Sequence, residues 1–177
     1  MSGKQQLERI IVAPAGDDKT RGRTVFGGSW ASCALGRSGI IRRKREGDGA
    51  TPAGSLLFVD VYYRPDRVRR PATNLPTYPL NPLSAWCDDP CHRHYNRAVR
   101  LPFAGSHECL WRSDHLYDLM VVLDYNLGRP RPGAGSAIFL HLAAADFSPT
   151  LGCVAVTLPT LRQILYRCGP GTYLDIG

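Results

Sequence analysis

The sequence predicts a mainly β domain, a β-sandwich or curled sheet with a long loop insertion and one C-terminal helix. Three observations indicate this class. Short apolar runs recur along the chain and are bounded by turn-forming residues. The 18 glycines and 14 prolines are spread over all 177 residues, as a chain with many turns requires. Only one stretch, close to the C-terminus, repeats its apolar residues at the spacing of a helix.

Length and composition bound the organisation of the chain. We expect residues 1–177 to form one domain, because a chain of this length can bury a core of its own. The hydrophobic fraction of 44% and the charged fraction of 21% are typical of globular proteins. No apolar run approaches the ~18 residues of a membrane span, and the first nine residues show no secretory signal.

The first half of the chain predicts strands separated by glycine-rich turns. Residues 7–12 form a first strand, and residues 24–26 and 30–35 form a hairpin across Gly27-Gly28, since paired glycines suit a two-residue turn. Residues 36–53 read as a polar, basic loop. Its last residues, Thr51-Pro52, favour extended backbone and direct the chain into a strand over residues 56–63, whose apolar and aromatic content indicates burial.

The second half begins with the insertion and ends with the helix. Residues 64–113 show little periodicity and seven prolines, which indicates a long ordered insertion of the kind that usually serves function. Strand character then returns in residues 116–125, 136–142 and 153–158. The helix that follows has Pro159 in its first turn and ends before Gly169-Pro170, and residues 172–176 form a last strand. One face of this helix carries Leu158, Leu161, Ile164 and Leu165.

The net charge of +7 arises from 22 Lys and Arg residues against 15 Asp and Glu residues. Much of the positive charge lies in residues 37–45 and 64–70. We interpret it as a solvated basic face rather than a nucleic-acid interface, because neither cluster is accompanied by a nucleic-acid-binding signature. A basic surface also suits a polyanionic wall or peptides that carry carboxylates.

A histidine and a cysteine flank the polar loop between two apolar runs, residues 137–142 and 154–157. His141 and Cys153 lie twelve positions apart, which is enough for the chain to turn and bring them together. A thiol is nucleophilic as the thiolate, and a nearby imidazole is the usual means of removing its proton. Gly152 permits a tight turn and leaves its N–H open to a substrate oxyanion. On spacing alone, two ordinary buried residues remain the alternative.

The residues around this pair resemble the signature of a known family. Thr150-x-Gly152-Cys153, after a strand ending in histidine, resembles the Ser/Thr-His-Gly-Cys signature of the YkuD-type L,D-transpeptidases. A second segment is similar to that family's stretch before a core strand, and the resemblance covers roughly residues 30–177. Its matching residues are Lys44, Gly47, Asp48, Thr51, Pro52, Gly54 and Phe58. The chain departs from the family at Leu142, Leu151 and Ala155, and its gap between histidine and cysteine is short.

The resemblance implies a YkuD-like fold and a bacterial cysteine acyltransferase of cell wall biogenesis and cell shape, in the periplasm or cell wall. Cys153 would form a thioester with a peptidoglycan stem peptide, and meso-diaminopimelate of a second stem would resolve it. The compact branch of the family implies 1-3 cross-links, from L-Ala to diaminopimelate; 3-3 links are the other possibility. With water as acceptor, the protein would be a carboxypeptidase or endopeptidase. No cofactor is implied.

Further residues are candidates for the substrate-binding surface or for orienting the histidine. Asp146 could orient His141, although a loop aspartate more often caps its own turn and a backbone carbonyl would serve equally well. Arg64 could meet a substrate carboxylate through its planar guanidinium. Residues 106–108 and 111–112 lie just before a core strand, where they could form a pocket wall. The full set of substrate-binding candidates is Arg64, His107, Trp111, Tyr125 and Asn126.

A cluster in the insertion supports a rival interpretation, a non-catalytic zinc-stabilised binding module. It contains Cys87, Cys91, His92, His94, His107 and Cys109. Such residues can bind zinc in a tetrahedral site, or form a disulfide in an exported protein. We prefer a third interpretation without metal, in which they line a loop near the active site. Five cysteines remain beside Cys153 and cannot all pair within one chain, which favours a free Cys153. An inactive wall-binding relative is the remaining alternative.

Overall fold

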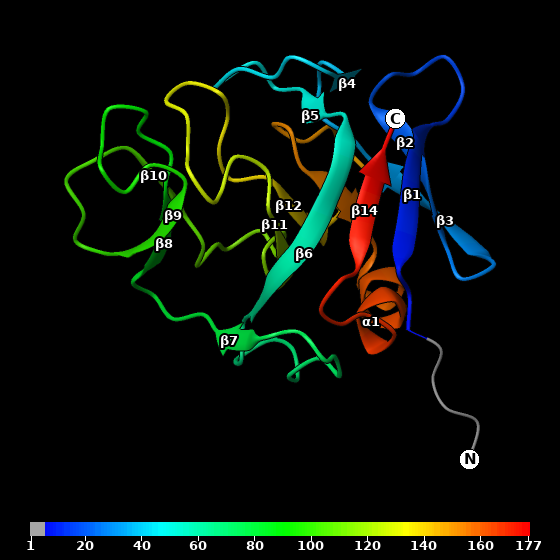
Figure 1. Cartoon of the computed structure of the whole chain (residues 1–177). Helices are drawn as coiled ribbons and strands as arrows, with labels where there is room; N and C mark the ends of the chain where they lie inside the picture. The colour runs from blue at the N-terminus through cyan, green and yellow to red at the C-terminus, as the bar shows by residue number, and fades with distance from the viewer. Residues whose placement is uncertain (1–5) are drawn as a thin grey trace.

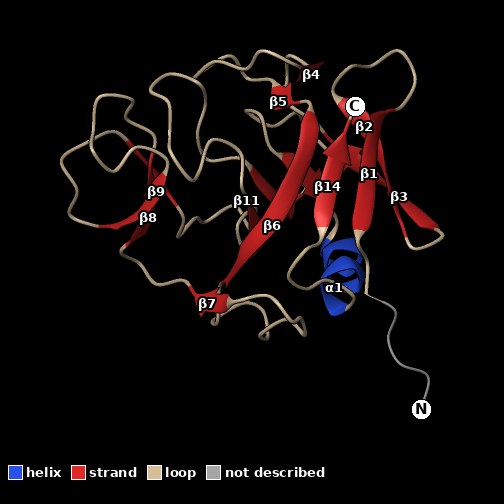
Figure 2. Ribbon diagram, viewed as in Figure 1, coloured by secondary structure: helices blue, strands red, loops and turns tan. Residues whose placement is uncertain are grey.

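The computed structural model describes residues 6–177 and is mainly β (Figures 1 and 2). Its strands are β1 (Arg9–Pro14), β2 (Arg21–Phe26), β3 (Ser29–Ala34), β4 (Ile40–Ile41), β5 (Thr51–Pro52), β6 (Gly54–Tyr63), β7 (Thr77–Pro79), β8 (Ser84–Cys87), β9 (Arg97–Arg100), β10 (His107–Cys109), β11 (Leu119–Leu123), β12 (Phe139–Leu142), β13 (Val154–Val156) and β14 (Tyr173–Ile176). The helix α1 spans Leu158–Tyr166. Residues 1–5, part of the segment without a visible secretory signal, lie outside this range. Within residues 6–177 no helix combines the length and hydrophobicity needed to cross a bilayer.

The main sheet closes on itself. Nine strands follow the order β11-β12-β13-β3-β2-β1-β14-β6-β7, and β11 also pairs with β6. The ten residues of β6 make this closure possible, because residues 54–57 pair with β14 and residues 58–63 pair with β11. Figure 1 shows β6 as the long strand that runs obliquely between these two partners. The curled, mainly β sheet predicted from the sequence is therefore confirmed.

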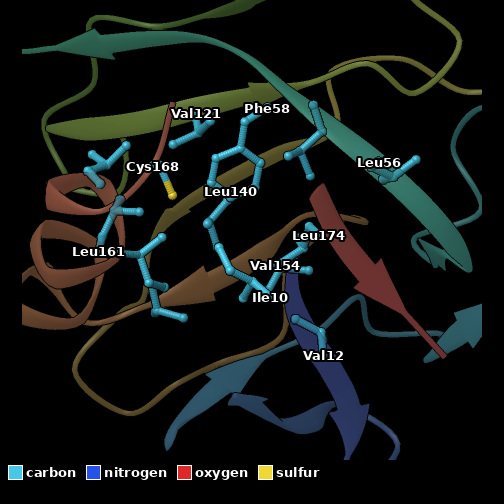
Figure 3. Packing of buried hydrophobic residues seen from close by; sticks show 14 of the residues in the cluster. Ile10, Val12, Leu56, Phe58, Val121, Leu140, Val154, Leu161, Cys168 and Leu174 are labelled. Atoms are coloured by element: carbon cyan, nitrogen blue, oxygen red, sulfur yellow. The ribbon is translucent and has the colours of Figure 1, made fainter. Parts of the chain in front are cut away.

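The main core fills the inside of this curled sheet. In β1, Ile10 and Val12 are fully buried whereas Ile11 is 51% exposed, so alternate residues face the core. The helix α1 adds Leu161, Ile164 and Leu165 to the same cluster, which confirms three members of its predicted apolar face. Figure 3 shows Leu161 and Cys168 beside Leu140 and Phe58 in this core. The side chain of Thr157 caps the helix by accepting the N–H of Thr160.

The predicted hairpin forms as expected. Strands β2 and β3 pair from Arg21↔Ala34 to Phe26↔Ser29 across Gly27-Gly28, and both glycines have positive φ (52° and 84°). The strands after the insertion are shorter than predicted. Residues 116–118 and 124–127 form turns rather than strand, so β11 keeps only Leu119–Leu123 of the expected residues 116–125.

The insertion contains regular structure that the sequence pattern did not predict. Strand β7 adds to β6 at the end of the main sheet, and β10-β8-β9 form a separate three-stranded sheet. Each of these strands has only three or four residues, too few to display a periodic pattern. Figure 2 shows the small sheet standing apart from the main sheet, among long loops.

The small sheet and its flanking loops cover the outer face of β11, β12 and β13. A second hydrophobic cluster joins Leu80, Trp86 and Leu110 of the insertion to the main sheet. Its members on the other side are Tyr117, Met120, Val122, Phe139 and Cys153. All residues of β11, β12 and β13 are consequently buried, because one face packs on the main core and the other on the insertion.

Candidate active site

A cavity of about 570 Å³ opens between the outer face of the main sheet and the insertion. His141 and Cys153 lie on the main-sheet side of this cavity. The insertion contributes the opposite wall, with residues that include His107, Glu108 and Arg112. The loop after β12 forms the rim, where Leu151 is 73% exposed. The two residues that the sequence singles out therefore share one cavity.

The strand register places His141 and Cys153 on the same face of the sheet. Strands β12 and β13 are parallel, with His141 opposite Ala155 and Leu140 opposite Val154. Since side chains alternate along a strand, Leu140 and Val154 enter the main core while His141 and Cys153 face the insertion. Within residues 6–177 no hydrogen bond joins the imidazole to the thiol. Ala155, which lies opposite His141 in this register, also lines the cavity.

The thiol of Cys153 is buried and bonded to the backbone of the preceding strand. Its Sγ accepts the N–H of Phe139 at 3.3 Å and donates to the carbonyl of Ala137 at 3.2 Å. Burial raises the pKa of Cys153 to about 12, and the nearby carboxylate of Glu108 acts in the same direction. The resting form is therefore the neutral thiol rather than a preformed thiolate.

The imidazole of His141 is held by a backbone carbonyl, one of the two arrangements expected from the sequence. Its Nδ1 lies 2.9 Å from the carbonyl oxygen of Leu142. Because a carbonyl can only accept, Nδ1 carries the hydrogen and Nε2 is the basic nitrogen of the neutral ring. Burial lowers the pKa of His141 to about 4, against the effect of the Leu142 carbonyl. Asp146 instead caps its own turn by accepting the N–H of Ser148 at 2.9 Å.

The turn before Cys153 requires a glycine. Gly152 has φ +139°, and a Cβ at this position would lie 2.8 Å from the carbonyl oxygen of Ala50. Thr150 closes the turn, because its hydroxyl accepts the N–H of Gly152 at 3.1 Å and donates to the carbonyl of Cys153 at 2.7 Å. The expectation that the Gly152 N–H stands open is therefore wrong for this resting structure, since the threonine hydroxyl occupies it.

Residues 44–52, part of the second segment that resembles the family, pack against this turn. The hydroxyl of Thr51 lies 3.3 Å from the carbonyl oxygen of Cys153 and accepts the N–H of Gly36 at 2.8 Å. The ammonium of Lys44 is buried and forms a 2.7 Å ion pair with Asp48. Burial acts to raise the pKa of Asp48, but hydrogen bonds from Arg45, Lys44 and Ala50 lower it below its usual value. Two segments distant in sequence thus build one turn.

A chain of polar side chains lies beside the thiol and the imidazole. The ring of Tyr117 packs edge-on against His141 with 5.1 Å between centroids. Its hydroxyl donates to Glu108 Oε1 at 2.6 Å, and Arg112 Nη1 lies 3.7 Å from the same oxygen. Burial raises the pKa of Glu108, although Tyr117 and Arg112 oppose this. The sequence placed Glu108 and Arg112 in a possible pocket wall, and both line the cavity. Tyr117 was not among the predicted site residues, because its contacts with His141 and Glu108 arise only in the folded chain.

Two of the predicted substrate-binding residues lie elsewhere. Arg64 is 4% exposed, and its guanidinium binds both carboxylate oxygens of Asp66 and the carbonyl of Arg112. It also stacks over the ring of Trp111 at 3.4 Å. Neither Arg64 nor Trp111 lines the cavity. The aromatic ring and the ion pair instead anchor the end of the insertion.

The other three predicted binding residues divide between the cavity and its support. His107 lines the cavity, with Nδ1 2.8 Å from the carbonyl oxygen of Gly105. Tyr125 donates to the carbonyl of Ala134, and Asn126 donates to the carbonyls of Arg131 and Gly135. Neither lines the cavity. These two residues shape the loop that leads into β12.

Asn96, which the sequence analysis did not single out, connects the insertion to the backbone beside the thiol. Its buried amide accepts the indole N–H of Trp86 and the N–H of Ala137, both at 3.0 Å. It donates to the carbonyls of Tyr125 and Asn126. The carbonyl of Ala137 accepts the thiol hydrogen of Cys153. By accepting the N–H of Ala137, Asn96 therefore fixes the backbone that the sulfur contacts. An asparagine in a loop without periodicity carries no local signal of this role.

The residues proposed for zinc do not converge. Among residues 6–177 no three His, Cys, Asp or Glu side chains are placed to hold a metal ion. The imidazoles of His92, His94 and His107 instead pack around the ring of Phe103, with centroids 4.7–6.4 Å away. All six cysteines are free, which removes the disulfide alternative in this structure. The three histidines of the cluster thus form an aromatic packing unit with Phe103 beside the cavity.

A thiol and an imidazole that share one cavity can support the transfer of acyl groups. The comparison with protein families agrees: the YkuD family, the L,D-transpeptidase catalytic domain, matches residues 10–176. The chain belongs to this family, whose activity is L,D-transpeptidation of peptidoglycan. No curated protein shows a significant match to the chain.

Proposed function

We propose that this protein cross-links peptidoglycan stem peptides through a thioester on Cys153, with His141 as the general base. The observation that carries the proposal is the shared cavity, in which thiol and imidazole occupy the same face of adjacent parallel strands. The pKa values of about 12 and about 4 make both groups neutral at pH 7. The proton therefore moves as the sulfur attacks rather than beforehand.

The proposed reaction has two halves that balance. In the first, Nε2 of His141 takes the thiol proton while Sγ attacks a stem-peptide carbonyl, and the imidazolium then protonates the departing amine. In the second, an uncharged acceptor amine attacks the thioester and loses a proton to His141. The C–S bond breaks, and the sulfur recovers that proton. A backbone N–H at Cys153 is our candidate oxyanion donor, and such a donor contributes about 3 kcal/mol.

We further propose L-Ala of stem position 1 as the donor residue, so that the product is a 1-3 link with diaminopimelate as acceptor. The support is the apolar character of the rim and of the surface around His141. Leu151 and Ala155, which replace polar family residues, both line the cavity with Leu116, Leu142 and Pro149. A small apolar donor residue suits these neighbours better than a charged diaminopimelate does.

The test incubates the purified chain with stem peptides and determines the products by mass spectrometry. We expect dimers that join L-Ala to diaminopimelate, and we expect Cys153→Ala and His141→Gln to abolish them. Dimers joined only through two diaminopimelate residues would reject the 1-3 assignment. Shortened monomers alone would show a carboxypeptidase or endopeptidase instead. Trapping with a thiol-directed carbapenem checks the nucleophile, because the adduct should map to Cys153 and be absent from Cys153→Ala.

A further inference from the structure

The charge of the cavity differs from the charge of the chain. The protein carries a net charge of +7, yet the cavity is lined by the carboxyl groups of Glu46, Asp88 and Glu108 and by the single guanidinium of Arg112. The carboxylate of Glu46 is already hydrogen-bonded within the protein, since its Oε2 accepts the hydroxyls of Tyr95 and Ser136. The remaining charged groups lie on the insertion wall, opposite the thiol.

Glu108 has an unused acceptor near the reacting groups. Its Oε1 accepts the hydroxyl of Tyr117, while Oε2 accepts no hydrogen bond from any residue that the structure describes. The carboxylate lies close enough to Cys153 to contribute, after burial, to the raised pKa of the thiol. Asp88 adds a second unused acceptor, because its buried Oδ1 has no hydrogen-bond partner within the described chain. Carboxylate oxygens without a hydrogen-bond donor favour a cationic ligand.

Arg112 stands next to Glu108 with one end of its guanidinium unused. Its Nε and Nη2 bind the carboxylate of Asp114. Its Nη1 faces Glu108 Oε1 at 3.7 Å, which is too long for a hydrogen bond, and makes none with residues 6–177. The guanidinium is near enough to His141 to contribute, after burial, to the lowered pKa of the imidazole. An anion and a cation therefore lie side by side, next to the thiol and the base.

We infer that Glu108 and Arg112 bind the zwitterionic end of the acceptor's diaminopimelate side chain. This end carries an ammonium and a carboxylate on one carbon, so the two charges are adjacent in the ligand as they are in the cavity. Glu108 binds the ammonium and Arg112 Nη1 binds the carboxylate. The inference rests on the proposed function, since it assumes that an amine resolves the thioester, but it is independent of which donor carbonyl is attacked.

The arrangement also explains how the amine becomes reactive beside the thioester. The amine attacks only as the free base, so the bound ammonium must first give one proton to a neighbouring carboxylate, which becomes a carboxylic acid. Burial raises the pKa of Glu108 and makes it a better acceptor for this proton than an exposed glutamate. Arg112 then discriminates acceptors, because an amine without the adjacent carboxylate leaves Nη1 unpaired.

The test separates the two halves of the reaction. Cys153 is first acylated by a donor stem peptide, and the acyl-protein is then mixed with one of two acceptors, followed by mass spectrometry. The acceptors are L-Ala-D-isoglutamyl-meso-diaminopimelate and the same peptide with the carboxylate beside the free amine converted to the carboxamide. The variants are Glu108→Gln, which keeps an acceptor for Tyr117, together with Arg112→Gln and Arg112→Lys. Exposed Arg97 on β9 provides the matched control Arg97→Gln.

The wild-type protein and Arg97→Gln should react at least about tenfold faster with the carboxylate acceptor than with its amide, because a charge-assisted hydrogen bond is lost. Both Arg112 variants should reduce this ratio toward one. Glu108→Gln should slow both acceptors relative to hydrolysis. An unchanged ratio in both Arg112 variants, with normal folding by circular dichroism, would overturn the inference. Failure of the wild-type protein to form an acyl-protein would instead overturn the proposed function, and the inference with it.

Discussion

At the scale of single residues, the structure describes a thiol and an imidazole that are both neutral at rest. Burial drives the two pKa values apart, to about 12 for Cys153 and about 4 for His141. The backbone holds both groups in place, because the carbonyl of Leu142 binds the imidazole and the N–H of Phe139 donates to the sulfur. A neutral pair of this kind protects the thiol from oxidation and from unspecific reagents until a substrate enters.

This state predicts the pH dependence of alkylation. Between pH 6 and pH 9 the rate of Cys153 modification by iodoacetamide should rise about tenfold per pH unit, because a thiol pKa above this range makes the thiolate fraction increase steadily. Site-resolved mass spectrometry separates Cys153 from the exposed Cys91 and Cys109. In Glu108→Gln the rate at pH 8 should increase, since removing the carboxylate lowers the thiol pKa. A rate that is constant across this range would indicate a thiolate–imidazolium pair instead.

At the scale of elements, the critical piece is the turn over residues 150–153, which receives its shape from residues 44–52. The hydroxyl of Thr51 bonds the carbonyl of Cys153, and Lys44, in its ion pair with Asp48, lies beside Gly152. Gly152 lies between them, where the carbonyl of Ala50 occupies the space of a Cβ. The family-like segments are thus explained by one packing requirement.

Two glycines provide a matched test of this packing. Gly152 and Gly54 both have φ +139°, but a Cβ on Gly54 meets nothing within 4 Å. We expect Gly54→Ala to lower the free energy of unfolding by about 1–3 kcal/mol through backbone strain alone. Gly152→Ala should lower it by about 1–3 kcal/mol more, because the backbone must also move away from Ala50. It should also reduce the rate of acylation, whereas Gly54→Ala should not. Urea denaturation measures the difference; equal losses would contradict the packing argument.

At the scale of the whole molecule, the insertion converts one face of the closed sheet into a cavity. Its residue Trp86 packs edge-on against Phe139 with 5.2 Å between centroids and donates to Asn96. Without this cover, Cys153 and His141 would lie on an open sheet surface, where water would compete for every polar contact. The insertion also supplies Glu108 and Arg112.

The contribution of the insertion can be measured with two tryptophans. Trp86→Ala should lower the free energy of unfolding by about 3–5 kcal/mol, since loss of the buried indole leaves a cavity and removes one of the two N–H donors to the Asn96 oxygen. It should also increase the alkylation rate of Cys153, because the cover loosens. Trp30 is 61% exposed on β3, and Trp30→Ala should change stability by less than about 0.5 kcal/mol. A similar small effect at Trp86 would mean that the insertion does not hold the cavity together.

The sequence by itself determined the class of fold, the hairpin at Gly27-Gly28 and the C-terminal helix, and it singled out His141, Gly152 and Cys153 as candidate site residues. These features follow from local patterns: alternation within a strand, paired glycines, helical spacing and a short motif. The tertiary structure alone decided that Arg64 and Trp111 anchor the insertion, that Asn96 fixes the backbone beneath the thiol, and that Tyr117 lies between Glu108 and His141. These roles depend on contacts between the insertion and residues outside it, chiefly those of β11 and β12. No local pattern in residues 64–113 indicates which face of the main sheet the insertion covers.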